Sequence, residues 1–489
     1  MIPVVLREEM ERLKAELKGV IAVSQVFDGT TEVAEIFAMT LTFVSKGKRC
    51  QRCIGLRLYN KSFDGPELAR AIMKELVSFF AMEALPTVVR YSTRDGASVN
   101  GAATEIIRNF IPRLVDLICM SHTANVAGQV LSRSCPSAKK VMELWSRMVK
   151  KSQMVRRLFF EYNTDVAEDE ERSALRNSYV RWFASFEVVR QMFRKWSIIK
   201  AICANVNIGL EETRASLSRE IELHETVILR ELAVTVDVGS YLVKLCYNLE
   251  GDGFISELAY DLWQNTVEKL TNVRDGEDNT TRAPVLNALI NETVQEVADR
   301  QDIFHFTLDK ARAAIDKVLT DTNGRLSTTI SVMKACRLTD YTFVLGKPLP
   351  ALVTELAILA HMPHLEDNKP QLSAELLSYQ ECAQEFADRF ADNGEEVKET
   401  LNEKGSNRWK FWITYQLRLP HWYKVACEAA LVRPSSCTVE RVFSLYDCMF
   451  SSQQQRALED YKQAAVILRY NSNQRESEQQ REREENMAG

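Results

Sequence analysis

The sequence predicts an α/β core interrupted by a large all-α insertion, in a chain that is predominantly helical overall. Three observations support this class. Strand-like runs alternate with helical patterns in the first quarter of the chain. The stretch between Pro136 and Pro284 then contains no proline and shows helical periodicity. A motif-rich segment near the end carries clear helix-start signals.

Composition narrows the class of protein further. A length of 489 residues favours two or three domains, and 46% hydrophobic residues supply ample core material. The net charge of -5 argues against nucleic-acid binding by bulk charge, so any DNA contact must use local basic surfaces. Eleven scattered cysteines indicate free thiols in a reducing compartment, and no apolar run is long enough to span a membrane. The cytoplasm and the nucleus therefore remain as the expected locations of the protein.

The chain opens with a predicted amphipathic helix within residues 1–18, followed by three strand-like runs. These runs cover Val20–Phe27, Ile36–Val44 and Cys53–Tyr59, and their short connections predict an antiparallel meander. The turn-like residues after the first run place Asp28 at a strand end.

A helical pattern from Gly65 to Met82 separates this meander from a fourth strand, Thr87–Ser92, which leads into Asp95. Such a crossover favours a parallel pairing of the first and fourth strands. A second helix and a fifth strand, Leu114–Cys119, follow. This order is that of a ribonuclease-H-like sheet, and it predicts that Asp28 and Asp95 meet at the carboxyl edge. Residues 19–125 form the first part of this core.

The rest of the chain divides by its helical periodicity and its residue composition. We expect residues 126–418 to form the α-helical insertion and residues 419–472 to complete the core. Residues 473–489 are almost wholly Arg, Glu, Gln and Ser, which predicts a disordered charged tail or a frayed helix end.

The late segment contains one acid that needs an explanation. Pro434–Ser436 are helix-start residues, and Val439 and Val442 recur at helical spacing. Glu440 therefore lies early on an otherwise apolar helix. An ion pair with Arg441 or another neighbour is the simplest explanation.

The segment Leu419–Asn471 resembles the C-terminal dimerisation and catalytic segment of hAT-superfamily DNA transposases. It contains the Pro-to-Ala lead-in, the Ser-Ser run, Glu-Arg-Val-Phe-Ser and a closing helix that ends at Asn. Upstream, Asp28-Gly-Thr, Asp95-Gly-Ala-Ser-x-Asn, Cys119-x-x-His and Arg181-Trp are similar to further motifs of the family. The resemblance implies DNA cleavage and strand transfer, homodimerisation or higher assembly through the C-terminal region, and a nuclear location.

The resemblance also implies a catalytic site made of Asp28, Asp95 and Glu440, holding Mg²⁺ or Mn²⁺. Phosphodiester cleavage with divalent cations needs hard oxygen ligands on rigid supports, and carboxylates supply them. Taken singly, each Asp-Gly pair is also an ordinary turn.

Further residues receive roles from the same resemblance. Cys119 and His122 would support the active site, although a buried thiol and a hydrogen-bonded histidine explain them equally well. Arg181 and Trp182 would bind DNA, the tryptophan by stacking on a base turned out of the duplex. A core tryptophan beside Phe183 is the alternative.

Two pairs of basic residues, Lys150 with Lys151 and Arg156 with Arg157, are candidate DNA-phosphate contacts. Such pairs are also common on solvated helix faces.

The main departure from the family is the expected lack of an N-terminal BED-type zinc finger, because few residues precede Asp28. Two other functions therefore stay open. One is a catalytically inactive, truncated or domesticated derivative that dimerises and associates with DNA. The other is a helical scaffold without nucleic-acid contact.

Overall fold

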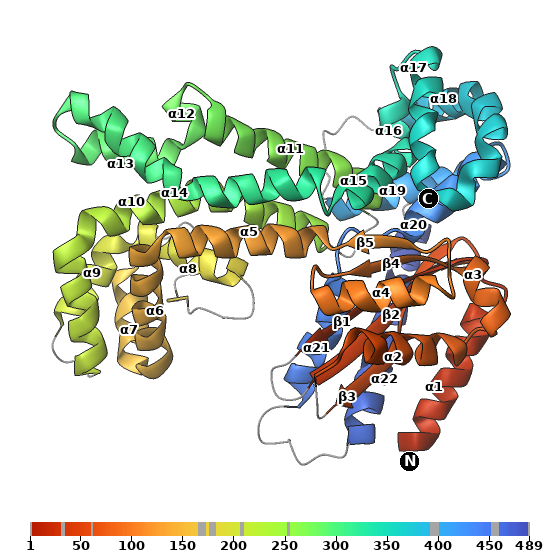
Figure 1. Ribbon diagram of the computed structural model, residues 1–489, viewed down its shortest axis with the longest axis horizontal. Coiled ribbons are helices and arrows are strands. Elements are labelled where there is room, and N and C mark those ends of the chain that lie inside the picture. Colours follow the sequence, from red (N-terminus) through yellow and green to blue (C-terminus); the bar gives the residue numbers. More distant parts are fainter. Residues whose placement is uncertain are drawn as a thin grey trace. The chain divides into compact units, whose positions relative to one another are not determined.

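The computed structural model describes residues 2–30, 35–59, 62–164, 173–175, 182–205, 210–251, 255–391, 401–450 and 459–487. These residues are predominantly helical and include a five-stranded mixed sheet. The chain divides into two compact units, each drawn from separate stretches of sequence (Figure 1). The first comprises Met1–His122, Asn248–Asp261 and Gly324–Gly489, and the second comprises Thr123–Tyr247 and Leu262–Asn323.

This division differs from the expected insertion of residues 126–418. The stretch from Gly324 to residue 418 belongs to the first unit, because its helices pack with the C-terminal ones that complete it. Helical periodicity alone could not separate these helices from those of the second unit.

The first unit contains the whole sheet and the helices around it. Its strands are β1 (Val23–Thr30), β2 (Glu35–Ser45), β3 (Lys48–Tyr59), β4 (Val89–Arg94) and β5 (Val115–Ile118). Its N-terminal helices are α1 (Ile2–Leu17), α2 (Gly65–Val77), η1 (Met82–Ala84), α3 (Leu85–Val88) and α4 (Ser98–Arg108). The later ones are α15 (Ser327–Cys336), η3 (Arg337–Thr339), α16 (Tyr341–Val344), α17 (Leu349–Glu355), η4 (Leu356–His361), η5 (Pro363–Asn368), α18 (Lys369–Ala391), α19 (Leu401–Tyr415), α20 (Pro420–Leu431), α21 (Cys437–Met449) and α22 (Glu459–Met487).

The sheet has the strand order β3-β2-β1-β4-β5. β1, β2 and β3 pair antiparallel, and β4 pairs parallel with both β1 and β5. The meander and the parallel pairing of the first and fourth strands are therefore confirmed. Asp28 lies near the carboxyl end of β1, as predicted, although the strand is longer than expected: β2 extends the ladder to Thr30, and Asp28 pairs with Ala38.

Helices cover both faces of this sheet (Figure 1). Alternate side chains of β1 point to opposite faces, so Phe27 packs in a core with α2 and α4, whereas Val26 packs in a core with α21 and α22. The second core includes Val439 of α21 and Ile467 of α22. The C-terminal segment thus closes one face of the sheet.

The last helix corrects the expectation of a disordered tail over residues 473–489, because α22 continues to Met487. Its charged residues have partners in the first unit. Arg475 donates to Glu9 of α1 at 2.8 Å and to Glu16 at 2.7 Å, and Glu478 accepts from Arg52 of β3 at 2.7 Å. A charge-rich composition therefore forms part of an ordered interface here.

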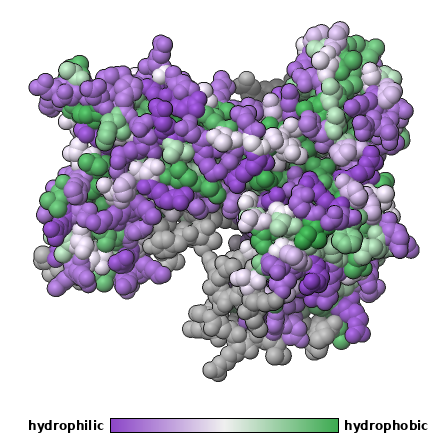
Figure 2. Space-filling view, in the orientation of Figure 1, coloured by the Kyte–Doolittle hydropathy of each residue, from purple (hydrophilic) through white to green (hydrophobic). Residues whose placement is uncertain are grey.

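The second unit is all-helical in the residues described. Its helices are α5 (Met120–Ser134), α6 (Pro136–Lys151), α7 (Gln153–Tyr162), α8 (Trp182–Arg194), α9 (Trp196–Ala204), α10 (Glu211–Leu249), α11 (Ser256–Asp275), α12 (Asn279–Arg282), α13 (Pro284–Thr293) and α14 (Val297–Asn323), of which α5, α10 and α11 run across unit boundaries. On the face seen in Figure 2, hydrophilic and hydrophobic side chains are interspersed over these helices.

Buried polar groups join the helices of the second unit. Asp237 of α10 accepts from the backbone N–H groups of Val285 and Leu286, at 3.0 and 2.9 Å, and so caps α13. Glu231 of α10 accepts from Lys310 at 2.8 Å. Throughout the part of the chain that the structure describes, no helix combines the length and apolar character needed to cross a bilayer.

Candidate functional site

The two strand-end aspartates come together at the carboxyl edge of β1 and β4. Val26 pairs with Thr93 in parallel register, and Asp28 and Asp95 each lie two residues further along. Side-chain alternation therefore places both on the face that α21 covers. The side-chain amide of Asn100 donates to Asp95 at 2.6 Å and to Asp28 at 3.4 Å. One amide nitrogen thus lies within hydrogen-bond reach of both carboxylates.

The proximity of the two carboxylates changes the protonation of Asp28. Burial, and secondly the negative charge of Asp95, raise the pKa of Asp28 to about 7. Hydrogen bonds from the Gly29 N–H and from Asn100 act in the opposite direction but are smaller. Asp28 therefore titrates near neutral pH.

The loop after β4 is held in place by Asp95 itself and by a neighbouring ion pair. The Asp95 carboxylate accepts from the Ala97 N–H at 2.8 Å. Arg94 donates to both oxygens of Asp116, at 3.0 and 2.8 Å, and to the Asp95 carbonyl. This bidentate pair joins β4 to β5 directly beside the carboxylates.

A cation lies next to the same loop. A Cβ placed on Gly96 would lie 2.6 Å from the guanidinium of Arg325, so the absence of a side chain at Gly96 permits this approach. Arg325 is exposed. Its positive charge also lowers the pKa of His122, after the larger effect of burial and against the opposing effect of Asp95.

Cys119 and His122 lie beside the carboxylates, as expected. The ring of His122 approaches Asp95, with 4.0 Å between Nε2 and Oδ2. The Cys119 sulfur accepts from the N–H groups of His122 and Ser436, at 3.2 and 3.3 Å. Burial raises the pKa of the Cys119 thiol to about 11, so it stays protonated at neutral pH. Cys119 therefore connects β5 to the residues before α21.

Further hydrogen bonds fix the start of α21 against the sheet. The Met120 N–H donates to the Pro434 carbonyl at 2.9 Å, and the hydroxyls of Thr40 and Thr438 are 2.9 Å apart. Glu440 lies one turn further on, in the first turn of α21. An acid in this position is favoured by the helix dipole. The neighbouring Arg441 donates to the Glu250 carbonyl.

The third carboxylate does not join the first two in a ready ligand set. Among the described residues, no three His, Cys, Asp or Glu side chains are grouped as a metal ion requires. The carboxylates of Asp28 and Asp95, which share one amide nitrogen of Asn100, are hard oxygen donors of the kind a divalent cation prefers, and the charge of a cation would offset their mutual repulsion. Glu440 is placed on the same side of the sheet by α21.

The structure places Trp182 in the core of the second unit. Its side chain is 6% exposed and packs on Phe186 and on the backbone of α5 and α10. A Cβ on Gly128 would lie 2.0 Å from the indole, and one on Gly239 would lie 2.9 Å from it. Trp182 is therefore a core residue in this structure, as the alternative interpretation expected. Stacking on a DNA base would require its side chain to become exposed. Arg181 lies outside the described residues.

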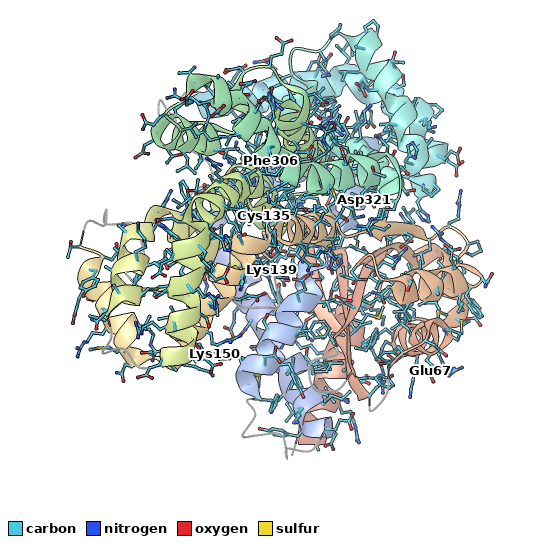
Figure 3. All side chains as sticks on the ribbon, turned by 60° about the vertical axis from the view of Figure 1, so that its left-hand side comes forward. Glu67, Cys135, Lys139, Lys150, Phe306 and Asp321 are labelled. Atoms are coloured by element: carbon cyan, nitrogen blue, oxygen red, sulfur yellow. The ribbon has the colours of Figure 1, made fainter. Side chains whose placement is uncertain are left out.

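The four basic candidates lie around the junction of α6 and α7 and are exposed. Lys150 is near the end of α6, and Lys139 is near its start (Figure 3). Arg156 donates to the Val149 carbonyl at 2.7 Å and so caps α6, whereas Arg157 pairs with Glu161. Lys150 and Lys151 are therefore the better placed of the four for an external anion.

Two residues of the site were not among the predicted ones. Asn100 was visible as the last residue of the Asp-Gly-Ala-Ser-x-Asn motif, five residues after Asp95 and in the first turn of α4, but its amide was given no role. Arg325 is distant in sequence, and no local pattern marks it.

The chain matches no known protein-family model and no curated protein sequence.

Proposed function

We propose that this chain is a hAT-like transposase, or a protein derived from one, that cleaves DNA strands and transfers them with the help of Mg²⁺ or Mn²⁺. The observation that carries the proposal is the pairing of Asp28 and Asp95 at the ends of adjacent parallel strands. The strand order and the helices that close the sheet support assigning the core to the ribonuclease-H-like class.

In this proposal Asp28 and Asp95 hold the cation, and Glu440 completes the ligand set from α21. A bound Mg²⁺ or Mn²⁺ supplies Lewis-acid activation of the attacking oxygen and stabilises the leaving oxygen. Asn100 orients the two aspartates by donating to both. Because the described residues do not gather three ligands, the role of Glu440 rests on the family resemblance and on the packing of α21.

The residues around the pair fit a phosphodiester substrate. Arg325 supplies a positive charge beside Gly96, where a phosphate approaching the carboxylates would pass. His122 is mostly neutral at pH 7, because its pKa is lowered, and its ring can accept a proton near Asp95. In the reaction, an oxygen of water or of a 3′ hydroxyl forms a bond to phosphorus and gives its proton to the neutral ring of His122. The bond to the leaving 3′ oxygen breaks, and that oxygen takes up a proton.

DNA and a second copy of the chain are the proposed partners, and the nucleus is the proposed location. The dimer follows from the family resemblance alone. The apolar side chains of α21 and α22, such as Val439, Val442 and Ile467, are buried against the chain's own sheet. A dimer would therefore use other surfaces of these helices.

The test is a strand-nicking assay on duplex and hairpin DNA with Mn²⁺. We expect the native chain to nick DNA, and Asp95→Asn and Glu440→Gln to lose at least a hundredfold in rate. Glu83→Gln is the matched control, since Glu83 is exposed and lies in η1, before the start of β4, whereas Asp95 follows the end of that strand. A folded native chain that binds DNA without cleaving it would favour the catalytically inactive derivative, and one that does neither would favour the helical scaffold.

A further inference from the structure

A basic surface lies at the end of the sheet opposite to Asp28 and Asp95. Two adjoining grooves, of about 370 and 470 Å³, open on either side of the turn between β2 and β3. They share Lys46, Lys48, Glu478 and Glu482, and we call them together the turn groove. All their lining residues belong to the first unit. Asp28 pairs with Ala38, seven residues from Ser45, so about 24 Å of strand separates the two places.

Basic residues dominate the turn groove. Of the described residues that line it, nine are basic and three are acidic, in a chain whose net charge is -5. The basic ones are Arg12, Lys18, Lys46, Lys48, Arg49, Arg52, Lys410, Arg475 and Arg481, and the acidic ones are Glu16, Glu478 and Glu482. This is a concentration of positive charge that the composition as a whole does not suggest.

Part of this charge is neutralised within the chain and serves the fold. Arg52 pairs with Glu16 and Glu478, at 2.7 Å in both cases, and Lys48 pairs with Glu482. Arg475 is also paired with Glu16, as described above. These contacts join α1, β3 and α22 and leave no acid of the groove without a basic partner.

The remaining lysines are uncompensated. Lys46 and Lys410 are exposed, and within the described stretches no acidic side chain pairs with either of them. The same holds for Lys18 at the end of the groove. Lys410 lines one groove, Lys18 the other and Lys46 both, so each groove presents positive charge that no acid of the described residues neutralises.

The backbone holds the central lysine in a defined position. Lys46 and Gly47 both have positive φ, 50° and 73°, as in the tight turns that join antiparallel strands. The indole N–H of Trp409 donates to the Gly47 carbonyl at 2.9 Å, and the Arg49 guanidinium lies 4.9 Å from the Trp409 ring. The turn is thus anchored to α19, which carries Lys410.

We propose that the turn groove is a second, non-catalytic surface that binds the phosphate backbone of DNA. Two adjoining grooves with separated lysines fit an extended polyanion better than one small anion, because each lysine can neutralise a different phosphate. Binding of a polyanion follows from the charges, whereas its identity as DNA rests on the proposed function.

The experiment measures binding of a fluorescent duplex DNA by anisotropy at several salt concentrations, without divalent cations. The variant is Lys46→Gln/Lys410→Gln. The control is Lys74→Gln/Lys244→Gln, which has the same net charge and changes two exposed lysines on α2 and α10. We expect the groove variant to bind at least tenfold more weakly near 0.1 M salt. Its slope of log K against log salt should fall in magnitude by about two, since each phosphate contact contributes roughly 0.9.

Three results would overturn the inference. The first is a groove variant whose slope of log K against log salt equals that of the native chain, and the second is an equal loss of affinity in the control variant. The third is groove-dependent binding of polyglutamate without binding of DNA, which would make the partner an acidic peptide. Circular dichroism melting of both variants checks the fold. If DNA binding depends on the groove but the native chain does not cleave DNA, only the proposed enzymatic activity is refuted. If the native chain cleaves DNA and the groove variant binds DNA as tightly as the native chain, only this inference is refuted.

Discussion

At the scale of single residues, Asp28 determines how the charge of the candidate site depends on pH. Its side chain is placed by the pleat of β1, on the same face as Asp95, and one amide of Asn100 serves both carboxylates. Burial and the second charge raise the pKa of Asp28 from 3.8 to about 7. In the absence of a cation, the folded chain at neutral pH therefore carries an unfavourable charge, and this has a cost in stability.

We expect Asp28→Asn to stabilise the cation-free chain at pH 8 by roughly 1–2 kcal/mol. Between about pH 4 and 7 the native fold holds a proton that the unfolded chain has released, so stability falls as pH rises through this window. Below it, Asp28 is neutral in both states and the advantage of Asn disappears. Urea unfolding at pH 8 and pH 4, with Glu83→Gln as control, measures the difference. Equal native and variant stability at pH 8 would show that the charge of Asp28 is not destabilising.

At the scale of elements, the closing helix α22 is joined to the edge of the sheet by Asn471. Its side chain accepts from the Cys53 N–H at 2.8 Å and donates to the Cys53 carbonyl at 3.1 Å and to Glu9 at 3.0 Å. β3 is an edge strand, and its pairing with β2 is irregular next to Cys53. Asn471 therefore satisfies backbone groups that an edge strand leaves open.

Asn471→Ala should lower the free energy of unfolding by about 2–3 kcal/mol, because a buried backbone N–H and carbonyl lose their partner. Asn473→Ala is the matched control, an exposed asparagine two residues further on the same helix. Chemical denaturation of the two variants measures the effect. Similar stabilities would mean that α22 is held by its apolar face alone.

The sheet could be predicted from sequence because its order depends on local patterns. Strand runs, short connections and one intervening helix sufficed for the meander and for the crossover to β4. The end of β1 could not be located, since a turn-like Asp-Gly pair is held in the ladder by its partner strand. The extent of α22 was missed for a similar reason, as Arg475 and Glu478 owe their order to residues more than 400 positions away.

At the scale of the whole molecule, sequence patterns could not predict which segments of the chain form each of the two units. A helical period marks an element but not the unit on which it packs, so α15 to α19 were assigned to the insertion although they belong with the sheet. Arg325 lies beside Gly96 because the stretch that begins at Gly324 packs in the same unit as the sheet, and no sequence motif indicates this packing. By contrast, Asp28 and Asp95 could be predicted together because the adjacent strands β1 and β4 bring them to one edge, and Cys119 and His122 were predicted from the family resemblance.

The central claim is that the strand-end aspartates bind a divalent cation, and Mn²⁺ binding followed by electron paramagnetic resonance tests it most directly. We expect the native chain to bind Mn²⁺ about tenfold more tightly at pH 8 than at pH 6, because Asp28 must lose a proton with a pKa of about 7. Asp95→Asn should abolish this binding, and Glu83→Gln should leave it unchanged. Equal affinity at both pH values, retained in Asp95→Asn, would contradict the claim.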